Sequence, residues 1–152
     1  MGVPWVQSSC GKCEWCQRGI QLFCADQIGT GVNTPGGHAK YMVAFADATQ
    51  LLSEGLSYEQ AAPIFCAGYT VYSRLGFAEP KPHEKVAVIG IGGLEHLAIQ
   101  YSVAAGFDTI AVTHSKDKED LAYRLGAVNV VNDGEEFKNA GGADVILATS
   151  NS

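Results

Sequence analysis

The sequence predicts an α/β fold in which a parallel four-stranded sheet follows an irregular, β-rich segment that carries a metal lobe. Three observations predict it: four closely spaced cysteines near the start, a glycine-rich turn after a short apolar run, and a β-α-β-α-β-α-β order from that run onward. With 152 residues, 47% of them hydrophobic, the chain can bury one core or two small ones, which excludes a disordered chain. We expect the two parts to meet near residue 80, in the proline-containing stretch 79–83.

Charge and hydropathy indicate which classes of partner are disfavoured and in which cellular compartment we expect the protein. The formal net charge is −6 with no basic stripe, which disfavours nucleic acids and anionic membranes as partners. The longest strongly apolar run, Val86–Leu94, is too short to span a bilayer. The first five residues have neither the basic nor the apolar segment of a secretory signal, so we expect a cytoplasmic protein.

The four cysteines form the most specific motif of the first part. Cys10, Cys13, Cys16 and Cys24 read C-x2-C-x2-C-x7-C within a lobe over residues 8–26. Overlapping C-x2-C pairs are poorly suited to separate disulfides and well suited to surround one zinc ion at about 2.3 Å, and four thiolates leave no open position, so such a zinc is structural. Two disulfides and an iron–sulfur cluster are the alternatives, although no Cys-Pro step of the bacterial ferredoxin kind is present. A thiol redox role is disfavoured because the pairs lack a strand–helix context.

Between this lobe and residue 80 the pattern is less regular. Residues 40–44 resemble a short strand. Ser57 and Gln60 form a capping box that opens a helix to about Phe65, and a second helix is predicted over 69–77. Judged by its apolar helical surroundings alone, Cys66 is more readily a core residue than a metal ligand.

Strands and helices alternate after residue 80. Short β-branched runs are typical of buried parallel strands, and the segments between them have helical patterns, the second of which is stopped by Gly126. We predict strands over 85–89, 109–112, 129–131 and 143–147, and helices over 94–105, 116–125 and 135–139.

A glycine turn joins the first of these strands to the first helix. In this context Gly90 would make the tight turn, Gly92 would let the backbone approach a pyrophosphate, and the helix N-terminus would supply free N–H groups. The third glycine of G-x-G-x-x-G is replaced by Glu95. A carboxylate suits a helix start, but it is a bulky like charge beside a pyrophosphate. The alternative is a strand–helix turn that binds nothing.

The residues after the second strand bear on the choice of nucleotide. Thr113, His114 and Ser115 stand where an acidic residue would bind the ribose 2′-hydroxyl of NAD. A 2′-phosphate is tolerated there, so NADP is favoured over NAD. We also expect Ser115 to cap the following helix.

Four motifs in this order are similar to those of a known family. They are the four-cysteine lobe, Gly36–Tyr41 (GGHAKY), Ala61–Tyr72 (AAPIFCAGYTVY) and the glycine turn. Together they resemble the zinc-dependent medium-chain alcohol dehydrogenases, most closely the bacterial alcohol and cinnamyl-alcohol-like branch, over essentially the whole chain. The resemblance implies a truncated GroES-like catalytic domain over residues 1–80 and a partial Rossmann domain over residues 81–152.

The resemblance also implies roles for single residues. Cys10, Cys13, Cys16 and Cys24 match the structural zinc ligands, Cys66 matches a ligand of the catalytic zinc, and Thr70 matches a residue near the nicotinamide. Two further groups match the pyrophosphate turn and the selector of the adenosine ribose, respectively: Gly90, Gly92, Gly93 and Leu94, and Thr113, His114, Ser115 and Lys118.

The activity that the resemblance implies is hydride transfer between a primary alcohol or aldehyde and NADP or NAD, with zinc polarising the substrate oxygen. The resemblance also allows a homo-oligomer. The other ligands of the catalytic zinc are expected before the cysteine lobe, and the last strands of the nucleotide-binding sheet are expected after residue 152. We therefore expect a truncated chain with an incomplete catalytic zinc site and little activity by itself. The alternative is a non-catalytic, zinc-stabilised binding or assembly module, which would hold one zinc rather than two.

Overall fold

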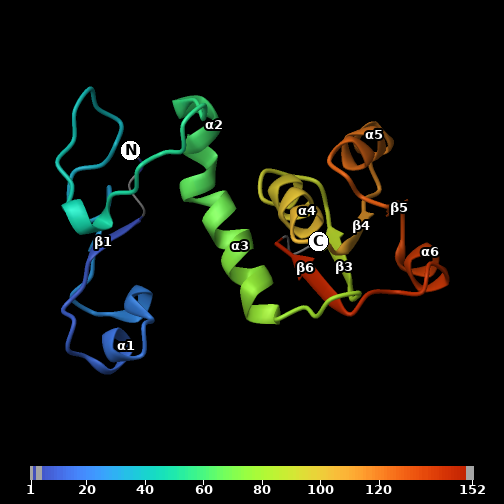
Figure 1. The fold of residues 1–152 in the computed structure, drawn as a ribbon, viewed down its shortest axis with the longest axis horizontal. Helices are drawn as coiled ribbons and strands as arrows, with labels where there is room; N and C mark the ends of the chain where they lie inside the picture. The colour runs from blue at the N-terminus through green and yellow to red at the C-terminus, as the bar shows by residue number, and fades with distance from the viewer. Residues whose placement is uncertain (1, 3–4, 150–152) are drawn as a thin grey trace. The chain divides into compact units, whose positions relative to one another are not determined.

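In the computed structural model, which describes Gly2 and residues 5–149, the chain forms two compact units that meet between Cys66 and Ala67 (Figure 1). The sequence predicts this boundary near residue 80. The helix α3 (Ala67–Ala78), which precedes residue 80 in the sequence, packs against α4 (Glu95–Ala104) within the second unit. No helix in the described part of the chain is long and apolar enough to cross a membrane. The expectation about a secretory signal falls partly on residues 1, 3 and 4, which lie outside the described residues.

The first unit is built from short elements. Strand β1 (Val6–Ser8) pairs antiparallel with β2 (Ile28–Gly29), and the cysteine lobe lies in the sequence between them. The lobe contains the helix α1 (Glu14–Gln17) and the 3-10 turn η1 (Gln21–Phe23), and the rest of the unit contains η2 (Ala46–Ala48), α2 (Tyr58–Ala61) and η3 (Ala62–Phe65).

The strand predicted over residues 40–44 is wrong. The structure assigns no strand there, and the side chains of Tyr41 and Val43 are exposed. Extended backbone becomes a strand only where a neighbouring strand satisfies its polar groups. Here the N–H of the next residue, Phe45, donates instead to the side-chain oxygen of Gln7 at 3.3 Å.

The predicted capping box is present at the start of α2. The Ser57 hydroxyl accepts from the backbone N–H of Gln60 at 3.2 Å, and the Gln60 side chain accepts from the backbone N–H of Ser57 at 3.1 Å. The α-helix ends at Ala61, however, and continues to Phe65 only as the 3-10 turn η3. Pro63 lies in the first turn of η3, where its missing N–H removes a donor of the α-helical ladder.

The second unit contains the predicted parallel sheet. Its strands are β3 (Lys85–Ile89), β4 (Asp108–Val112), β5 (Asn129–Val131) and β6 (Val145–Ala148), in the spatial order β5-β4-β3-β6, and the helices between them are α4, α5 (Lys116–Arg124) and α6 (Gly134–Asn139). The chain therefore moves outward from β3 through β4 to β5 and then returns to the other side of β3. This reversal makes the carboxyl ends of β3 and β6 the topological switch point, where ligands of such sheets bind.

The core of the second unit lies between the sheet and its helices. Val86 and Val88 of β3 are fully buried, as is Ile99 of α4, and Val71 joins them from α3. The hydroxyl of Ser102, on α4, is also fully buried and has no hydrogen-bond partner in the described part of the chain. The unit is therefore stabilised by apolar burial, and one buried polar atom opposes it.

Two substitutions in α4 should change stability in opposite directions. Ile99→Ala should lower the free energy of unfolding by about 2–5 kcal/mol because it leaves a cavity in the core. Ser102→Ala should leave it unchanged or raise it by about 1 kcal/mol, since no hydrogen bond is lost. Urea unfolding followed by circular dichroism measures both, and a Ser102→Ala loss as large as that of Ile99→Ala would contradict the assignment of an unpartnered hydroxyl.

Candidate functional site

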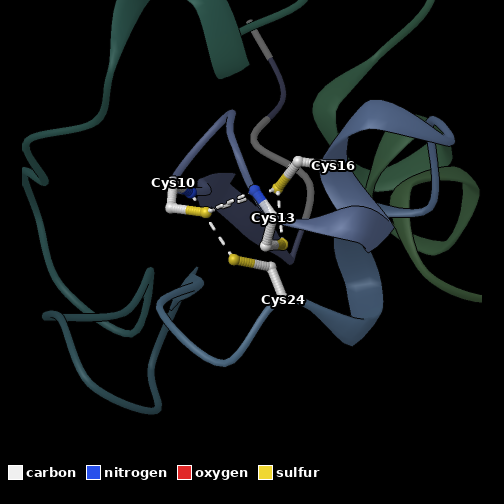
Figure 2. A group of neighbouring side chains, drawn as sticks. All are labelled: Cys10, Cys13, Cys16 and Cys24. Carbon is white, nitrogen blue, oxygen red and sulfur yellow. Dashed lines mark hydrogen bonds between the residues drawn. The ribbon is translucent and has the colours of Figure 1, made fainter.

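The four thiols of the lobe converge on one point (Figure 2). All four sulfur atoms lie within 4.8 Å of one another, with 3.9 Å between those of Cys10 and Cys16 and 3.5 Å between those of Cys13 and Cys16. A tetrahedral zinc with Zn–S bonds of about 2.3 Å requires sulfur separations of about 3.8 Å. The cysteines are free thiols rather than disulfides. The spacing also fits one ion better than an iron–sulfur cluster, whose cysteines bind different irons.

The backbone of the lobe supports this convergence. Gly11 and Gly19 have φ angles of +72° and +74°, a left-handed conformation that only glycine adopts without strain. The backbone N–H of Cys13 donates to the sulfur of Cys10 at 3.3 Å, and that of Cys10 donates to the sulfur of Cys24 at 3.5 Å. The donor on Cys10 favours the thiolate form of this residue, which is the form that binds metal.

The thiols differ in how readily they ionise. The backbone N–H of Lys12 is the main cause that lowers the pKa of Cys10, and a hydrogen bond with the side chain of Ser9 is the main cause that lowers that of Cys16 to about 6. For Cys13 the backbone N–H of Cys16 lowers the pKa, but burial and the neighbouring thiols outweigh it and raise the value to about 11. Because zinc binds thiolates, its binding must release protons from this lobe.

The lobe also contains a small aromatic cluster. The rings of Trp15 and Phe23 lie 5.4 Å apart between centroids, and the guanidinium of Arg18 lies 5.3 Å from the centroid of the Trp15 ring. Arg18 also forms an ion pair with Glu14 at 3.1 Å, one helical turn earlier. The contact between Trp15 and Phe23 joins α1 to η1.

Cys66, the predicted ligand of a catalytic zinc, does not belong to a cluster of metal-ligating side chains in the described residues. Cys66 is exposed, and the only group of three or more metal-ligating side chains in the described residues is the four-cysteine cluster. Thr70, predicted near a nicotinamide, is exposed on the first turn of α3. The sequence also contains a His-Glu pair, His83-Glu84, but it precedes β3 in a turn where the Glu84 carboxylate accepts from the backbone N–H of Lys81 at 2.7 Å.

The glycine turn lies where the sequence predicts it, between β3 and α4. Gly90 has a φ angle of +89°, and its N–H donates to the carbonyl of Val112 at the end of β4. Gly92, Gly93 and Leu94 follow, and α4 begins at Glu95. The turn therefore opens at the switch point between β3 and β6.

The side chain of Glu95 is directed back into this turn. Its Oε2 accepts from the N–H of Gly92 at 2.9 Å, its Oε1 accepts from the hydroxyl of Thr149, and the residue is only 6% exposed. Burial raises the pKa of Glu95, but the hydrogen bonds from Thr149, its own N–H and Gly92, with the charge of Lys118, outweigh burial and lower it. As it stands, the turn does not offer the Gly92 N–H to a pyrophosphate.

The residues predicted to select the ribose follow β4 at the same edge of the sheet. Thr113 is buried, and its hydroxyl accepts from the N–H of Ser115 at 3.2 Å, whereas His114 and Lys118 are exposed. The predicted capping role of Ser115 is wrong: its hydroxyl donates to the carboxylate of Asp117 at 3.4 Å and accepts no N–H of α5.

Comparisons with known proteins place this geometry in context. No family model matches the chain. An alcohol dehydrogenase of Geobacillus stearothermophilus is 46% identical over 132 residues, which are 87% of this chain and 39% of that protein. An alcohol dehydrogenase of Moraxella sp. is 38% identical over 156 residues, 99% of this chain and 46% of that protein. The chain thus spans less than half the length of these relatives.

Solved structures give the same result. A CAD of Helicobacter pylori in complex with NADP(H) matches with a TM-score of 0.78 and 28% identity, over 89% of this chain and 42% of that one. A thermostable alcohol dehydrogenase of Pyrobaculum aerophilum, with cobalt and zinc bound, matches with a TM-score of 0.82 and 27% identity, over 98% of this chain and 46% of that one.

The purified chain should contain one zinc ion, held by the cysteine lobe. Cys24→Ser should reduce the zinc content to near zero because it removes the most buried of the four ligands, while the matched control Cys66→Ser should retain the ion. Elemental analysis of the purified variants measures this. Two zinc ions per wild-type chain, or loss of zinc in Cys66→Ser, would contradict a single four-cysteine site.

The stability of the second unit should depend on the ionisation of Glu95. Its pKa lies below the ordinary value of 4.5 in the folded chain, so the carboxylate stabilises the fold above the unfolded pKa and this contribution is lost as the pH falls through the folded pKa. The difference in free energy of unfolding between wild type and Glu95→Gln should therefore shrink from about pH 7 to about pH 3. A difference that does not vary between these pH values would contradict it.

Proposed function

We propose that this chain belongs to the zinc-dependent medium-chain alcohol dehydrogenase family, and that it supplies the structural zinc lobe and the nucleotide-binding fold of an enzyme that interconverts primary alcohols and aldehydes. The observation that carries the proposal is the four-cysteine cluster, whose sulfur separations fit one tetrahedral zinc. The parallel sheet with a glycine turn at its switch point is the second support.

The reaction is a balanced hydride transfer. An alcohol carbon gives a hydride to NAD(P)+, the hydroxyl releases a proton, and the products are the aldehyde, NAD(P)H and H+. A catalytic zinc, when bound, supplies a Lewis acid at the substrate oxygen and needs three protein ligands with an open position. Cys66 is proposed as one of these ligands. Since one thiol cannot hold this ion, a polypeptide of residues 1–152 should be inactive by itself.

The proposed contacts with the nucleotide follow the family's motifs. Thr70 would lie beside the nicotinamide, and the turn from Gly90 to Leu94 would face the pyrophosphate. NADP is favoured over NAD because His114 and Lys118 are exposed beside the ribose position. The division into a catalytic part over 1–80 and a nucleotide-binding part over 81–152, a cytoplasmic location and a homo-oligomeric state belong to the same proposal.

A second candidate function is a non-catalytic, zinc-stabilised binding or assembly module. Two observations favour it. Cys66 is exposed and belongs to no cluster of ligating side chains in the described residues, and the Glu95 carboxylate occupies the glycine turn. The cysteine lobe and the apolar core of the sheet would both stabilise the fold of a non-catalytic protein as well.

A chimera separates the two functions. The parts of the Geobacillus stearothermophilus protein that lie outside the matched region are joined to this chain, which carries Glu95→Gly so that the turn is open. We expect two zinc ions per chain and alcohol-dependent formation of NAD(P)H, because the Geobacillus parts would then supply the further ligands that the proposal requires beside Cys66. Cys66→Ala in the chimera should reduce the zinc content to one and the activity to background.

The chimera experiment also has an outcome that would contradict the proposal. A folded chimera that holds zinc and binds the nucleotide, yet oxidises no primary alcohol, would contradict the proposed activity and favour the binding module. Circular dichroism and zinc content serve as the folding controls for every variant.

A further inference from the structure

We propose that the Glu95 carboxylate is a built-in occupant of the pyrophosphate position and competes with dinucleotides for the nucleotide turn of this chain, so that it weakens their binding. The inference rests on the proposed nucleotide-binding role of the turn and is independent of the chemistry at Cys66. It concerns the one position at which the turn departs from G-x-G-x-x-G.

The place of the carboxylate in the fold is the first support. Residues Ile89 and Ala148 pair at the carboxyl ends of β3 and β6, so the segments that follow these two strands leave the sheet side by side. Glu95 accepts a hydrogen bond from each segment, from Gly92 after β3 and from Thr149 after β6. It therefore bridges the crevice at the switch point, where a bound dinucleotide would lie.

The second support is that the carboxylate uses what a pyrophosphate would need. A pyrophosphate binds such a turn through free backbone N–H groups, close approach at the second glycine and the positive end of the following helix. Here the Gly92 N–H already donates to Glu95, whose Oε2 lies only 2.8 Å from where a Cβ of Gly92 would be. The positive end of α4, which would attract the pyrophosphate, already has the negative charge of Glu95 in its first turn.

The third support is the energetics of moving this side chain. A glutamate at the first position of a helix can point into water and still benefit from the helix dipole. Glu95 is instead buried, with hydrogen bonds to two segments and the charge of Lys118 acting on it. Opening the turn would remove these partners, and leaving the carboxylate in place would set it against a pyrophosphate of the same sign. The charge of Lys118, a proposed contact of the ribose, contributes to the lowered pKa of Glu95.

The test measures binding of NADP+ to the full chain by titration calorimetry, without any alcohol. Glu95→Gly should bind NADP+ at least about tenfold more tightly than wild type, because it restores the third glycine and removes the charge. The matched control Glu135→Gly makes the same substitution in the first turn of α6 and should bind as wild type does. If Glu95→Gly does not fold, Glu95→Gln removes the charge alone and should still bind more tightly than wild type.

A second readout follows the turn directly. The Gly92 amide should be protected from hydrogen exchange in wild type and should exchange faster in Glu95→Gly, as measured by NMR. The proposal is overturned if wild type binds NADP+ as tightly as Glu95→Gly, or if no folded variant at position 95 binds more tightly. Tighter binding by Glu95→Gly with an inactive chimera would refute the proposed alcohol chemistry and leave this inference standing.

Discussion

Four thiols held within 4.8 Å of one another are the constraint on which the first unit depends. Its described residues include only two buried hydrophobic side chains, Cys24 and Ala61, while Trp5, Phe23 and Val43 are exposed. Such a unit cannot be stabilised by apolar burial in the way that the sheet of the second unit is. A zinc ion held by the four thiols would supply the missing free energy, because the binding energy of an ion that binds only the folded lobe is folding energy. In the proposed holo form, the lobe is the core of this unit.

The second unit rests on a different force and leaves its polar groups at one edge. Valine, isoleucine and alanine side chains form the core between the sheet and its helices, and the helix that follows a strand begins with backbone N–H groups that lack intrahelical partners. At the turn before α4, the Glu95 carboxylate accepts one backbone N–H, that of Gly92. The same hydrogen bonds that stabilise the empty turn compete with an anionic ligand, so stability and nucleotide binding oppose each other at one residue.

The four-cysteine cluster of this chain contrasts with its glycine turn and with Cys66. The four thiols of the lobe lie together, within 4.8 Å of one another. By contrast, Glu95 replaces the third glycine of the turn, and Cys66 has no ligating neighbours in the described residues.

The sequence by itself determined the cysteine spacing, the order of strands and helices after residue 80, the capping box at Ser57 and the place of the glycine turn. Each is a local pattern, set by residues within a few positions of one another. Only the tertiary structure decided that α3 packs with the second unit, that residues 40–44 form no strand and that the Ser115 hydroxyl turns to Asp117. It also decided where the Glu95 carboxylate points, because one of its partners, Thr149, lies 54 residues away and comes close only when β6 pairs with β3.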